Sequence, residues 1–272
     1  MNLQLCYLDA YARSVEARVV AVEAAGGGGA TLLVLDSTVF YPGGGGQPSD
    51  RGLLLRAADG RTWAVRGARK SGGEIVHELD PDVEPPAVGD RLEADLDWAR
   101  RYALMRTHTA LHALCGVVWR DYGALVTGGN MEPGAGRMDF EFERMSGDLV
   151  DEIEATVNAE LAQARDVRVD VLPRIEAFAI PDLIRTKVNL LPEGIEEIRT
   201  IEIVGLDLQA DGGTHVANTT EVGRIRVTGY ESKGRINKRI RISLEDGSSS
   251  MSGSGSIPSA AVEDHQPSPE RR

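Results

Sequence analysis

The spacing of apolar residues changes once along this chain, near residue 97, and this change constrains the fold more than any other feature. Before it, short apolar or alternating segments separated by Gly and Pro occupy residues 14–22, 31–35, 53–56, 62–66, 74–78 and 91–96. Segments of this length and spacing are typical of a small β-barrel. From Trp98 to about Trp119 the apolar residues instead recur at helical spacing. We therefore predict a barrel domain over residues 1–96 and a long helix directly after it.

The rest of the chain mixes helices with strands. A second amphipathic helix is predicted over 148–165, and a short helix is expected to begin within 175–183. Strands are predicted over residues 137–142, 166–173, 198–203, 225–230 and 235–244. Because helices and strands do not alternate regularly, the predicted fold class is α+β rather than a doubly wound parallel sheet. The second domain is placed at residues 97–244.

Two segments are predicted to lie outside the packed elements. The run Gly26 to Gly29 is expected to form the tip of a hairpin. Residues 245–272 contain mainly Ser, Gly, Pro and charged side chains, with little apolar surface to bury. We expect this last segment to be a disordered tail without a role in the fold.

The composition excludes several classes of protein. Two cysteines, Cys6 and Cys115, are too few for a disulfide scaffold or for a zinc site made of four thiolates. No apolar run approaches the roughly 18 residues of a membrane-spanning helix, and the N-terminus lacks the pattern of a signal peptide. We therefore expect a cytoplasmic protein with no membrane partner. The net charge of −12 disfavours indiscriminate binding along nucleic acid but allows a local basic surface.

Three of the five histidines are spaced as metal ligands would be. His108 and His112 stand four residues apart in the predicted long helix, so both imidazoles project from one face, about one turn apart. His215 closes a segment that begins at Asp211 and contains two glycines, which allow a sharp bend. Three imidazoles and one carboxylate suit a borderline ion such as zinc. The alternative is that two histidines share a helix face by chance and belong to the core. Thr109 stands where zinc peptidases have glutamate, which disfavours a peptidase.

A glycine-rich loop is the second unusual segment. Gln47 and Pro48 follow four consecutive glycines, and no Gly-Lys-Ser or Gly-Lys-Thr is present, so the loop is not a nucleotide P-loop. Such a run is entropically costly, and its free N–H groups can form a site for an anion. The alternative is a flexible connection between barrel strands. The four residues are Gly43, Gly44, Gly45 and Gly46.

A basic segment lies near the end of the second domain. Between residues 224 and 241, seven Arg or Lys accompany a single acidic residue, Glu231. Alternate residues of a strand share one face, so part of this segment could hold phosphate groups. The alternative is a solvated strand edge that is protected by charge.

Taken together, these segments resemble one family. Residues 105–112 resemble the first zinc motif of the alanyl-tRNA synthetase editing domain, and residues 211–216 with Thr219 and 221–223 resemble the second. The barrel with its glycine loop, and residues 233–239, are similar to the free-standing AlaX proteins of the medium-length type. The likeness covers nearly the whole chain before the tail. It implies a two-layer α+β editing domain of the threonyl/alanyl-tRNA synthetase type after the barrel.

The resemblance also implies a function, the hydrolysis of tRNA-Ala that has been wrongly charged with serine or glycine. An alanine pocket cannot strongly reject a smaller amino acid or one that adds only a hydroxyl, so a second, hydrolytic site is needed. The motifs imply zinc on His108, His112 and His215, with Asp211 at a position where the family usually has cysteine. Aspartate ligates zinc well, and a harder ligand leaves the ion more Lewis acidic. Zinc is the expected cofactor, with Asp211 as its fourth ligand or as a base that holds a water.

The resemblance further implies which residues contact the substrate. Thr127 is expected to hydrogen-bond the serine hydroxyl, with Asn130 nearby on the same segment; a plain turn is the alternative. The acceptor end of tRNA-Ala is expected to contact Gly43, Gly44, Gly45, Gly46, Gln47, Lys233, Arg235 and Lys238. Two other functions stay open, a zinc-dependent hydrolase of another ester and a non-catalytic tRNA-binding module. The sequence does not decide between a monomer and a homodimer.

Overall fold

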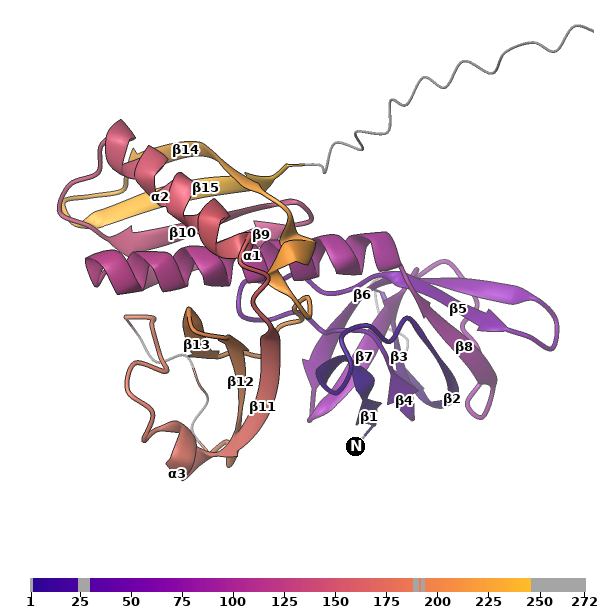
Figure 1. The fold of residues 1–272 in the computed structure, drawn as a ribbon. Coiled ribbons are helices and arrows are strands. Elements are labelled where there is room, and N and C mark those ends of the chain that lie inside the picture. The colour runs from indigo at the N-terminus through magenta and orange to yellow at the C-terminus, as the bar shows by residue number, and fades with distance from the viewer. Residues whose placement is uncertain (1, 24–29, 188–190, 192–193, 246–272) are drawn as a thin grey trace, which may run out of the picture.

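The computed structural model describes residues 2–23, 30–187, 191 and 194–245, which form a barrel and an α+β domain joined by one long helix (Figure 1). Six strands close the barrel in the order β2-β3-β7-β6-β5-β8. All six correspond to strands predicted from the sequence. Their bounds are β2 (Ser14–Glu23), β3 (Thr31–Leu35), β5 (Gly52–Arg56), β6 (Arg61–Ser71), β7 (Glu74–Leu79) and β8 (Arg91–Leu96).

The interior of the barrel is filled by side chains. Leu33, Leu54, Trp63 and Ile75 are each no more than 2% exposed. A barrel filled in this way is a packed core and not a channel. A short parallel pair lies beside it, formed by β1 (Leu3–Gln4) and β4 (Ser37–Thr38), with the 3-10 helix η1 (Leu5–Tyr7) after β1.

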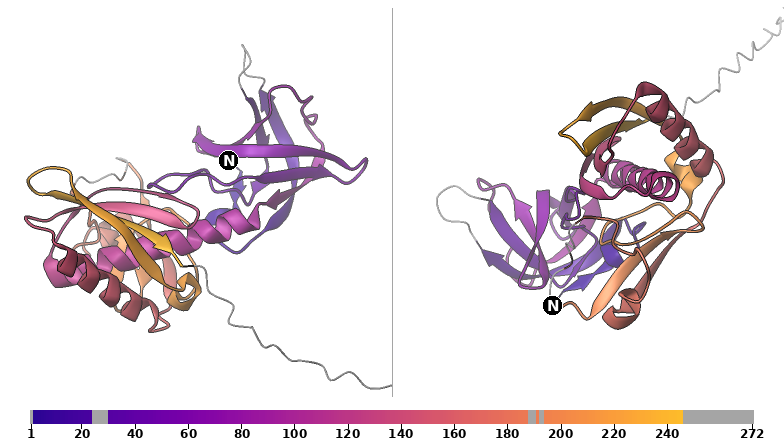
Figure 2. Two further views of the ribbon diagram at one scale, coloured as in Figure 1. Left: turned by 90° about the horizontal axis from the view of Figure 1, so that it is seen from above. Right: turned by 90° about the vertical axis from the view of Figure 1, so that its left-hand side faces the viewer.

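Helix α1 (Trp98–Tyr122) begins where the sequence predicts. Asp97 caps it, because its carboxylate accepts a hydrogen bond from the backbone N–H of Arg100 at 3.0 Å. The helix continues past the predicted end to Gly123, whose left-handed backbone (φ 62°) closes the last turn. Nearly all side chains between residues 104 and 118 are buried, because α1 lies between the two sheets of the second domain (Figure 2).

The predicted α+β class is confirmed, and the first part of the second domain has the expected two layers. Helices α1 and α2 cover one face of an antiparallel sheet with the strand order β14-β15-β10-β9 (Figure 1). The core between the layers includes Leu114, Phe140, Ile153 and Ile240, which are fully buried. The bounds are α2 (Gly147–Leu161), β9 (Val126–Glu132), β10 (Ala135–Glu141), β14 (Ile225–Ser232) and β15 (Asn237–Leu244).

A second antiparallel sheet, β11-β12-β13, lies on the other side of α1 (Figure 1). Its strand β13 leads directly into residues 211–218, the loop that holds the second predicted metal motif. The elements are β11 (Val167–Pro173), β12 (Glu197–Ile203) and β13 (Asp207–Ala210), with the helices α3 (Arg174–Ala177) and η2 (Thr219–Val222).

The differences from the predicted elements have local causes. Strand β9 was not predicted because its sequence, Val-Thr-Gly-Gly-Asn-Met-Glu, lacks apolar alternation; pairing with β10 holds it. Strand β13 has four residues, too few for a recognisable pattern. Helix α2 ends before the predicted residue 165, and α3 occupies only the start of the expected short helix. The predicted hairpin tip at 26–29 and the tail from residue 246 lie outside the described residues.

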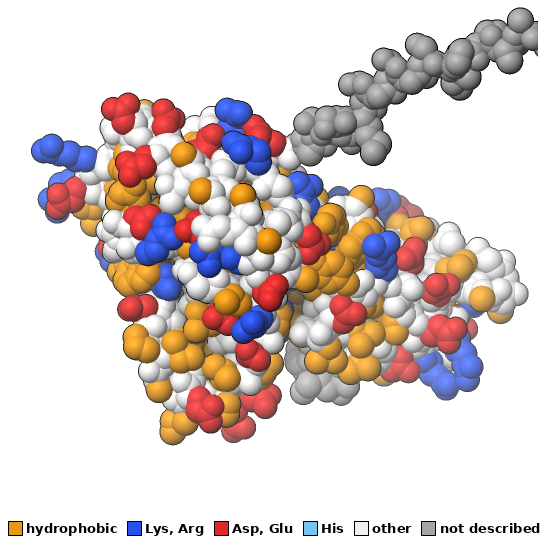
Figure 3. Space-filling view, in the orientation of Figure 1, with side chains coloured by type: hydrophobic (Ala, Val, Ile, Leu, Met, Phe, Trp, Pro, Cys, Tyr) orange, Lys and Arg blue, Asp and Glu red, His pale blue; other side chains and the backbone are white. Residues whose placement is uncertain are grey.

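Charged side chains of both signs are interspersed over the face shown in Figure 3. Among the helices that the structure describes, none is long and apolar enough to cross a membrane.

Candidate metal centre

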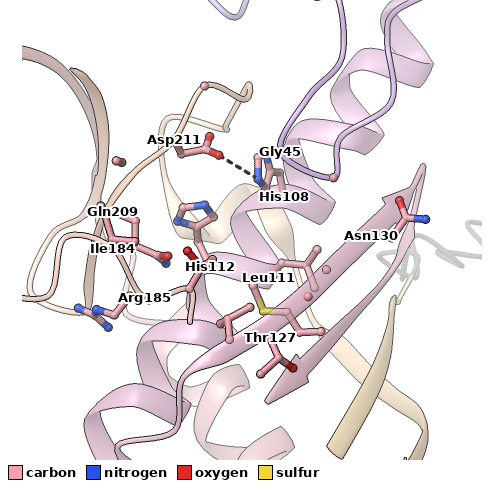
Figure 4. Close-up of a pocket in the computed structure, with 18 of the residues that line it drawn as sticks. Gly45, His108, Leu111, His112, Thr127, Asn130, Ile184, Arg185, Gln209 and Asp211 are labelled. Carbon is pink, nitrogen blue, oxygen red and sulfur yellow. Dashed lines mark ion pairs between the residues drawn. The ribbon is translucent and has the colours of Figure 1, made fainter. Parts of the chain in front are cut away.

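Four side chains meet at one side of α1, two from the helix itself and two from the loop after β13. His108 and His112 project from the helix, and Asp211 projects toward them from the loop after β13 (Figure 4). His215 completes the group, in which one donor atom of each residue lies within 4.8 Å of the others. The imidazole centroid of His215 is 4.3 Å from that of His108 and 4.7 Å from that of His112. The structure thus brings together the four residues predicted as metal ligands.

Each imidazole has a side-chain oxygen beside its Nδ1 atom. These distances are 3.0 Å from His108 to Gln47 Oε1, 3.0 Å from His112 to Asp207 Oδ2 and 3.2 Å from His215 to Thr109 Oγ1. Because amide and carboxylate oxygens are acceptors, Nδ1 carries the hydrogen in both His108 and His112. When these two rings are uncharged, their Nε2 atoms keep a lone pair, which is the arrangement found in histidines that bind metals.

Burial and neighbouring charges set the protonation of the group. Burial lowers the pKa of His215 to about 4 and holds the pKa of His108 well below its usual value. Burial opposes ionisation of Asp211, but His108 and His215 outweigh it and hold the pKa of the carboxyl well below its usual range. Burial also opposes a charge on His112, yet the hydrogen bond with Asp207 outweighs it and raises the pKa. At neutral pH two uncharged imidazoles therefore stand beside a carboxylate.

Asp211 is oriented within its own loop. Its Oδ2 atom accepts a hydrogen bond from the backbone N–H of Gly213 at 2.5 Å and lies 3.1 Å from His215 Nε2. A Cβ atom on Gly213 would lie 2.2 Å from Cε1 of His108, so this position accepts only glycine. Three imidazole nitrogens and one carboxylate oxygen are the donors that zinc and similar ions prefer. The residues present therefore fit a bound divalent metal.

His108, His112 and Asp211 line part of a cavity of about 790 Å³. Leu111 and Met138 contribute apolar surface, while Thr127 and Asn130 contribute polar groups from β9 (Figure 4). Volumes of this order are typical of pockets that enclose a small organic group.

Thr127 and Asn130, the residues predicted to contact the substrate, lie on strand β9. Thr127 Oγ1 donates a hydrogen bond to Asn237 Oδ1 at 2.8 Å, and Asn130 Oδ1 accepts one from the Met131 backbone N–H at 2.9 Å. Both side chains are exposed at the cavity and belong to a strand rather than to a plain turn.

The glycine loop forms another wall of the cavity. All four of its glycines have positive φ angles, between 60° and 136°, which other residues rarely adopt. The backbones of Gly44 and Gln47 exchange two hydrogen bonds of 3.0 Å. Gly45 and Gly46 line the cavity, and the Met131 N–H of β9 donates to the Gly46 carbonyl at 3.2 Å. The loop is therefore fixed against β9.

The side chain of Gln47 points inward and is only 3% exposed. Besides facing His108, its Oε1 atom accepts a hydrogen bond from the Thr214 N–H at 3.0 Å. Its Nε2 atom donates to Thr214 Oγ1 at 2.8 Å. The sequence predicts Gln47 as a contact for tRNA, whereas the structure places its side chain among the groups that position the candidate metal ligands.

The predicted tRNA contacts of the basic segment differ in how many hydrogen bonds and ion pairs their side chains make within the protein. Arg235 is exposed, and its side chain makes no hydrogen bond or ion pair with the described residues. Lys233 lies 3.1 Å from Glu231. Lys238 is buried, and its ammonium donates to the carbonyls of Gly234 and Arg235, both at 2.8 Å, so it closes the β14–β15 hairpin. The other cations pair with carboxylates, namely Arg224 and Arg226 with Glu245, Arg239 with Asp139 and Arg241 with Glu231.

Sequence reasoning missed several residues that support the site. Asp207, which holds His112, lies on the unpredicted strand β13. Arg185 lines the cavity, and its Nη1 atom lies 3.3 Å from Asp207 Oδ1. Thr109 lies inside the first motif, but nothing in the sequence indicates its contact with His215. These contacts arise from tertiary packing and leave no local pattern.

Two known families match parts of the chain. Residues 198–241 match the threonyl and alanyl tRNA synthetase second additional domain, and residues 9–100 match the class II (A) tRNA synthetases. The first match includes Asp211 and His215, and the second covers the barrel strands. The fold and the site thus define a protein of the class that carries this additional domain.

Relatives that match most of the chain narrow this class. The alanyl-tRNA editing protein AlaX-M of Methanosarcina mazei is 36% identical over 255 residues, which cover 92% of this chain and 100% of the relative. AlaX-M of Saccharolobus solfataricus is 36% identical over 240 residues, or 88% of this chain and 98% of the relative. The alanine–tRNA ligase of Saccharolobus islandicus is 32% identical over 234 residues, or 84% of this chain but 25% of the ligase. This chain belongs to the AlaX-M family of alanyl-tRNA editing proteins.

Proposed function

We propose that this chain is an editing deacylase, a carboxylic ester hydrolase that removes serine or glycine from wrongly charged tRNA-Ala in the cytoplasm. The observation that carries the proposal is the convergence of three imidazoles and Asp211, of which His108, His112 and Asp211 line a cavity of about 790 Å³. Membership of the AlaX-M family supports tRNA-Ala as the substrate, because the relatives are named as alanyl-tRNA editing proteins.

Zinc is the proposed cofactor, and His108, His112, His215 and Asp211 would hold it. The uncharged imidazoles of His108 and His215 and the ionised carboxyl of Asp211 suit a divalent cation at neutral pH. When bound, the ion supplies a Lewis acid that polarises a carbonyl or lowers the pKa of a water. An aspartate at the position of the family's usual cysteine keeps a charged donor there and removes a thiolate that oxidants attack.

The chain's own polar groups would orient the ester. Thr127 Oγ1 donates its hydrogen to Asn237 Oδ1. Its lone pairs can therefore accept a hydrogen bond from the hydroxyl of a seryl group. Alanine lacks this hydroxyl, and the contact therefore favours serine over alanine. Asn130 has its Oδ1 atom occupied by the Met131 N–H, which leaves its amide nitrogen as the donor toward the substrate.

Hydrolysis requires one water and no further reactant. The water oxygen bonds to the ester carbonyl carbon, the bond from that carbon to the ribose oxygen breaks, and the ribose oxygen takes up the proton that the water gives up. Gln47, Asp207 and Thr109 keep the three imidazoles in place during this step.

The acceptor end of the tRNA would approach over the glycine loop and the tip of the β14–β15 hairpin. Gly44 and Gly45 are exposed in the loop, and Lys233 and Arg235 are exposed at the hairpin. Phosphate contacts of this kind position the nucleic acid without reading its bases.

The proposal is tested by incubating the purified full chain with Ser-tRNA-Ala and Gly-tRNA-Ala, with Ala-tRNA-Ala as the control. We expect the seryl or glycyl ester to be lost far above its spontaneous rate while most Ala-tRNA-Ala survives. Binding of tRNA-Ala without cleavage of any ester would contradict the proposal and support a non-catalytic tRNA-binding module. Cleavage of small esters alone would indicate a hydrolase with another substrate.

A further inference from the structure

The loop that carries His215 has no regular secondary structure, yet side chains accept the hydrogen bonds of its backbone N–H groups. The pairs are Thr214 with Gln47 at 3.0 Å, Val216 with Thr109 at 3.3 Å, Ala217 with Tyr11 at 2.8 Å and Asn218 with Glu221 at 3.1 Å. Since paired backbone donors specify the path of a buried segment, these side chains set the shape of the loop. Two of them, Tyr11 and Gln47, come from the first 50 residues of the chain.

Tyr11 contacts the loop directly at Ala217 and also through the carboxylate of Glu221. Its hydroxyl accepts the Ala217 N–H and donates to Glu221, whose two oxygens both lie 2.8 Å away. The hydroxyl of Tyr102, on α1, donates to the same carboxylate at 3.0 Å. Glu221 thus joins the segment before β2, helix α1 and the end of the loop formed by residues 211–218, which we call the metal loop. Its carboxylate also accepts the N–H groups of Ala217 and Asn218, both at 3.1 Å, and completes a capping box at η2.

The contact of Tyr11 with Ala217 lies two residues after His215, a candidate metal ligand. Thr109 holds the His215 imidazole at Nδ1 and the following Val216 N–H, and Tyr11 holds the next residue, Ala217. Val216 is 1% exposed, so the short connection between Ala217 and His215 is packed in the core. A shift of Ala217 would therefore move the His215 backbone, because buried packing leaves little room to absorb it.

We propose that Tyr11 is a positioning residue of the metal centre. Together with Glu221, its hydroxyl fixes the exit of the loop, so the N-terminal domain helps to set how tightly His215 holds the ion. This inference rests on the proposed metal-dependent function. It assigns the segment before the barrel a role in the site of the second domain.

The test is the affinity of the metal-free full chain for Co²⁺, measured from its visible absorption, and for Zn²⁺ in competition with it. Tyr11→Phe removes one oxygen and keeps the ring, whose centroid lies 5.9 Å from that of Trp98. We expect binding about 10-fold weaker and an altered cobalt spectrum, as for other groups that orient a metal ligand. Tyr102→Phe, which touches Glu221 but not Ala217, should weaken binding less.

The matched control is Tyr230→Phe, because Tyr230 is 46% exposed on β14. Its affinity and cobalt spectrum should equal those of the wild type, and the melting temperature of each variant is measured alongside. If Tyr11→Phe binds cobalt with wild-type affinity and spectrum, whatever its melting temperature, the proposal is wrong while the proposed function stands. A wild-type chain that binds neither ion contradicts the metal-dependent function and removes this inference with it.

Discussion

Oε1 of Gln47 lies 3.0 Å from Nδ1 of His108, although the two residues stand 61 positions apart and belong to different domains. The same oxygen accepts the backbone N–H of Thr214, next to His215 of the candidate metal centre. The side-chain amide of Gln47 therefore contacts both segments of the candidate metal centre, at His108 and at Thr214. The barrel domain is in this sense part of the site and not a separate module attached to it.

The first prediction concerns this amide. Gln47→Ala leaves the His108 Nδ1–H and the Thr214 N–H without their acceptor in a buried site. Loss of such a partner typically costs about 10–100-fold in metal affinity or activity, and we expect losses of that size in both zinc binding and deacylation. Gln163→Ala, at an exposed position, is the control. Wild-type zinc affinity in Gln47→Ala, measured by chelator competition, would show that this contact does not hold the imidazole.

Two adjacent glycines allow a matched test of the metal loop. A Cβ on Gly213 would lie 2.2 Å from His108 Cε1, whereas a Cβ on Gly212 meets no atom within 4 Å. Gly213→Ala should therefore displace His108, abolish tight metal binding and destabilise the fold by about 1–3 kcal/mol through overpacking. Gly212→Ala should stay within about 0.5 kcal/mol of the wild type. Urea unfolding of the metal-free proteins gives both values, and equal effects of the two substitutions would contradict the proposed crowding at His108.

Two basic residues of one hairpin should behave differently. Arg235 is exposed and unpaired within the described part of the chain, so Arg235→Ala should weaken tRNA binding and lower the slope of log affinity against log salt by about 1. Lys238 holds two carbonyls of the hairpin, so Lys238→Met should mainly cost stability, by about 1–3 kcal/mol. Binding isotherms at several salt concentrations, together with unfolding curves, separate the two effects. An unchanged salt slope in Arg235→Ala would remove that residue from the tRNA contacts.

A buried histidine of the barrel predicts how stability depends on pH. His77 lies between the Leu33 carbonyl, 3.0 Å from Nδ1, and Thr38 Oγ1, 2.7 Å from Nε2. Burial lowers its pKa from 6.5 to about 4. The unfolded chain therefore takes up this proton first as the pH falls, and the folded state loses stability between about pH 6.5 and pH 4, with no contribution from this group above that window.

The size of this loss is about 3 kcal/mol for a shift of that magnitude. It is measured as the free energy of unfolding at a series of pH values for the wild type and for His77→Gln. Other titrating groups are shared by both proteins, so the difference between the two curves isolates His77. The wild type should lose more stability on acidification than the variant. Parallel curves would mean that His77 accepts a proton in the fold without penalty.

Local patterns were sufficient for much of the fold and for singling out the four residues that the structure brings together. Alternating apolar residues gave the barrel strands, because the two faces of each strand meet different surroundings within a few residues. The four-residue spacing of His108 and His112 follows from helix geometry alone. Asp211 and His215 were recognisable because two glycines separate them in a short segment.

The supporting contacts could not be predicted, because they join residues far apart in the chain. Asp207 and His112 are 95 positions apart, and Tyr11 and Ala217 are 206 apart. The basic segment shows the same limit. Its cations could be counted from the sequence, but the acids that neutralise several of them, Asp139 and Glu245, come from outside the segment.

If the four clustered residues hold a catalytic metal, deacylation requires that metal. The decisive measurement is hydrolysis of Ser-tRNA-Ala and Gly-tRNA-Ala by the chelator-treated chain, with its metal content verified, before and after addition of stoichiometric zinc. We predict that the metal-free protein stays folded but inactive and that zinc restores cleavage of the mischarged tRNA. Full activity in the verified metal-free protein, or zinc binding that restores no cleavage, would contradict metal-dependent deacylation at this site.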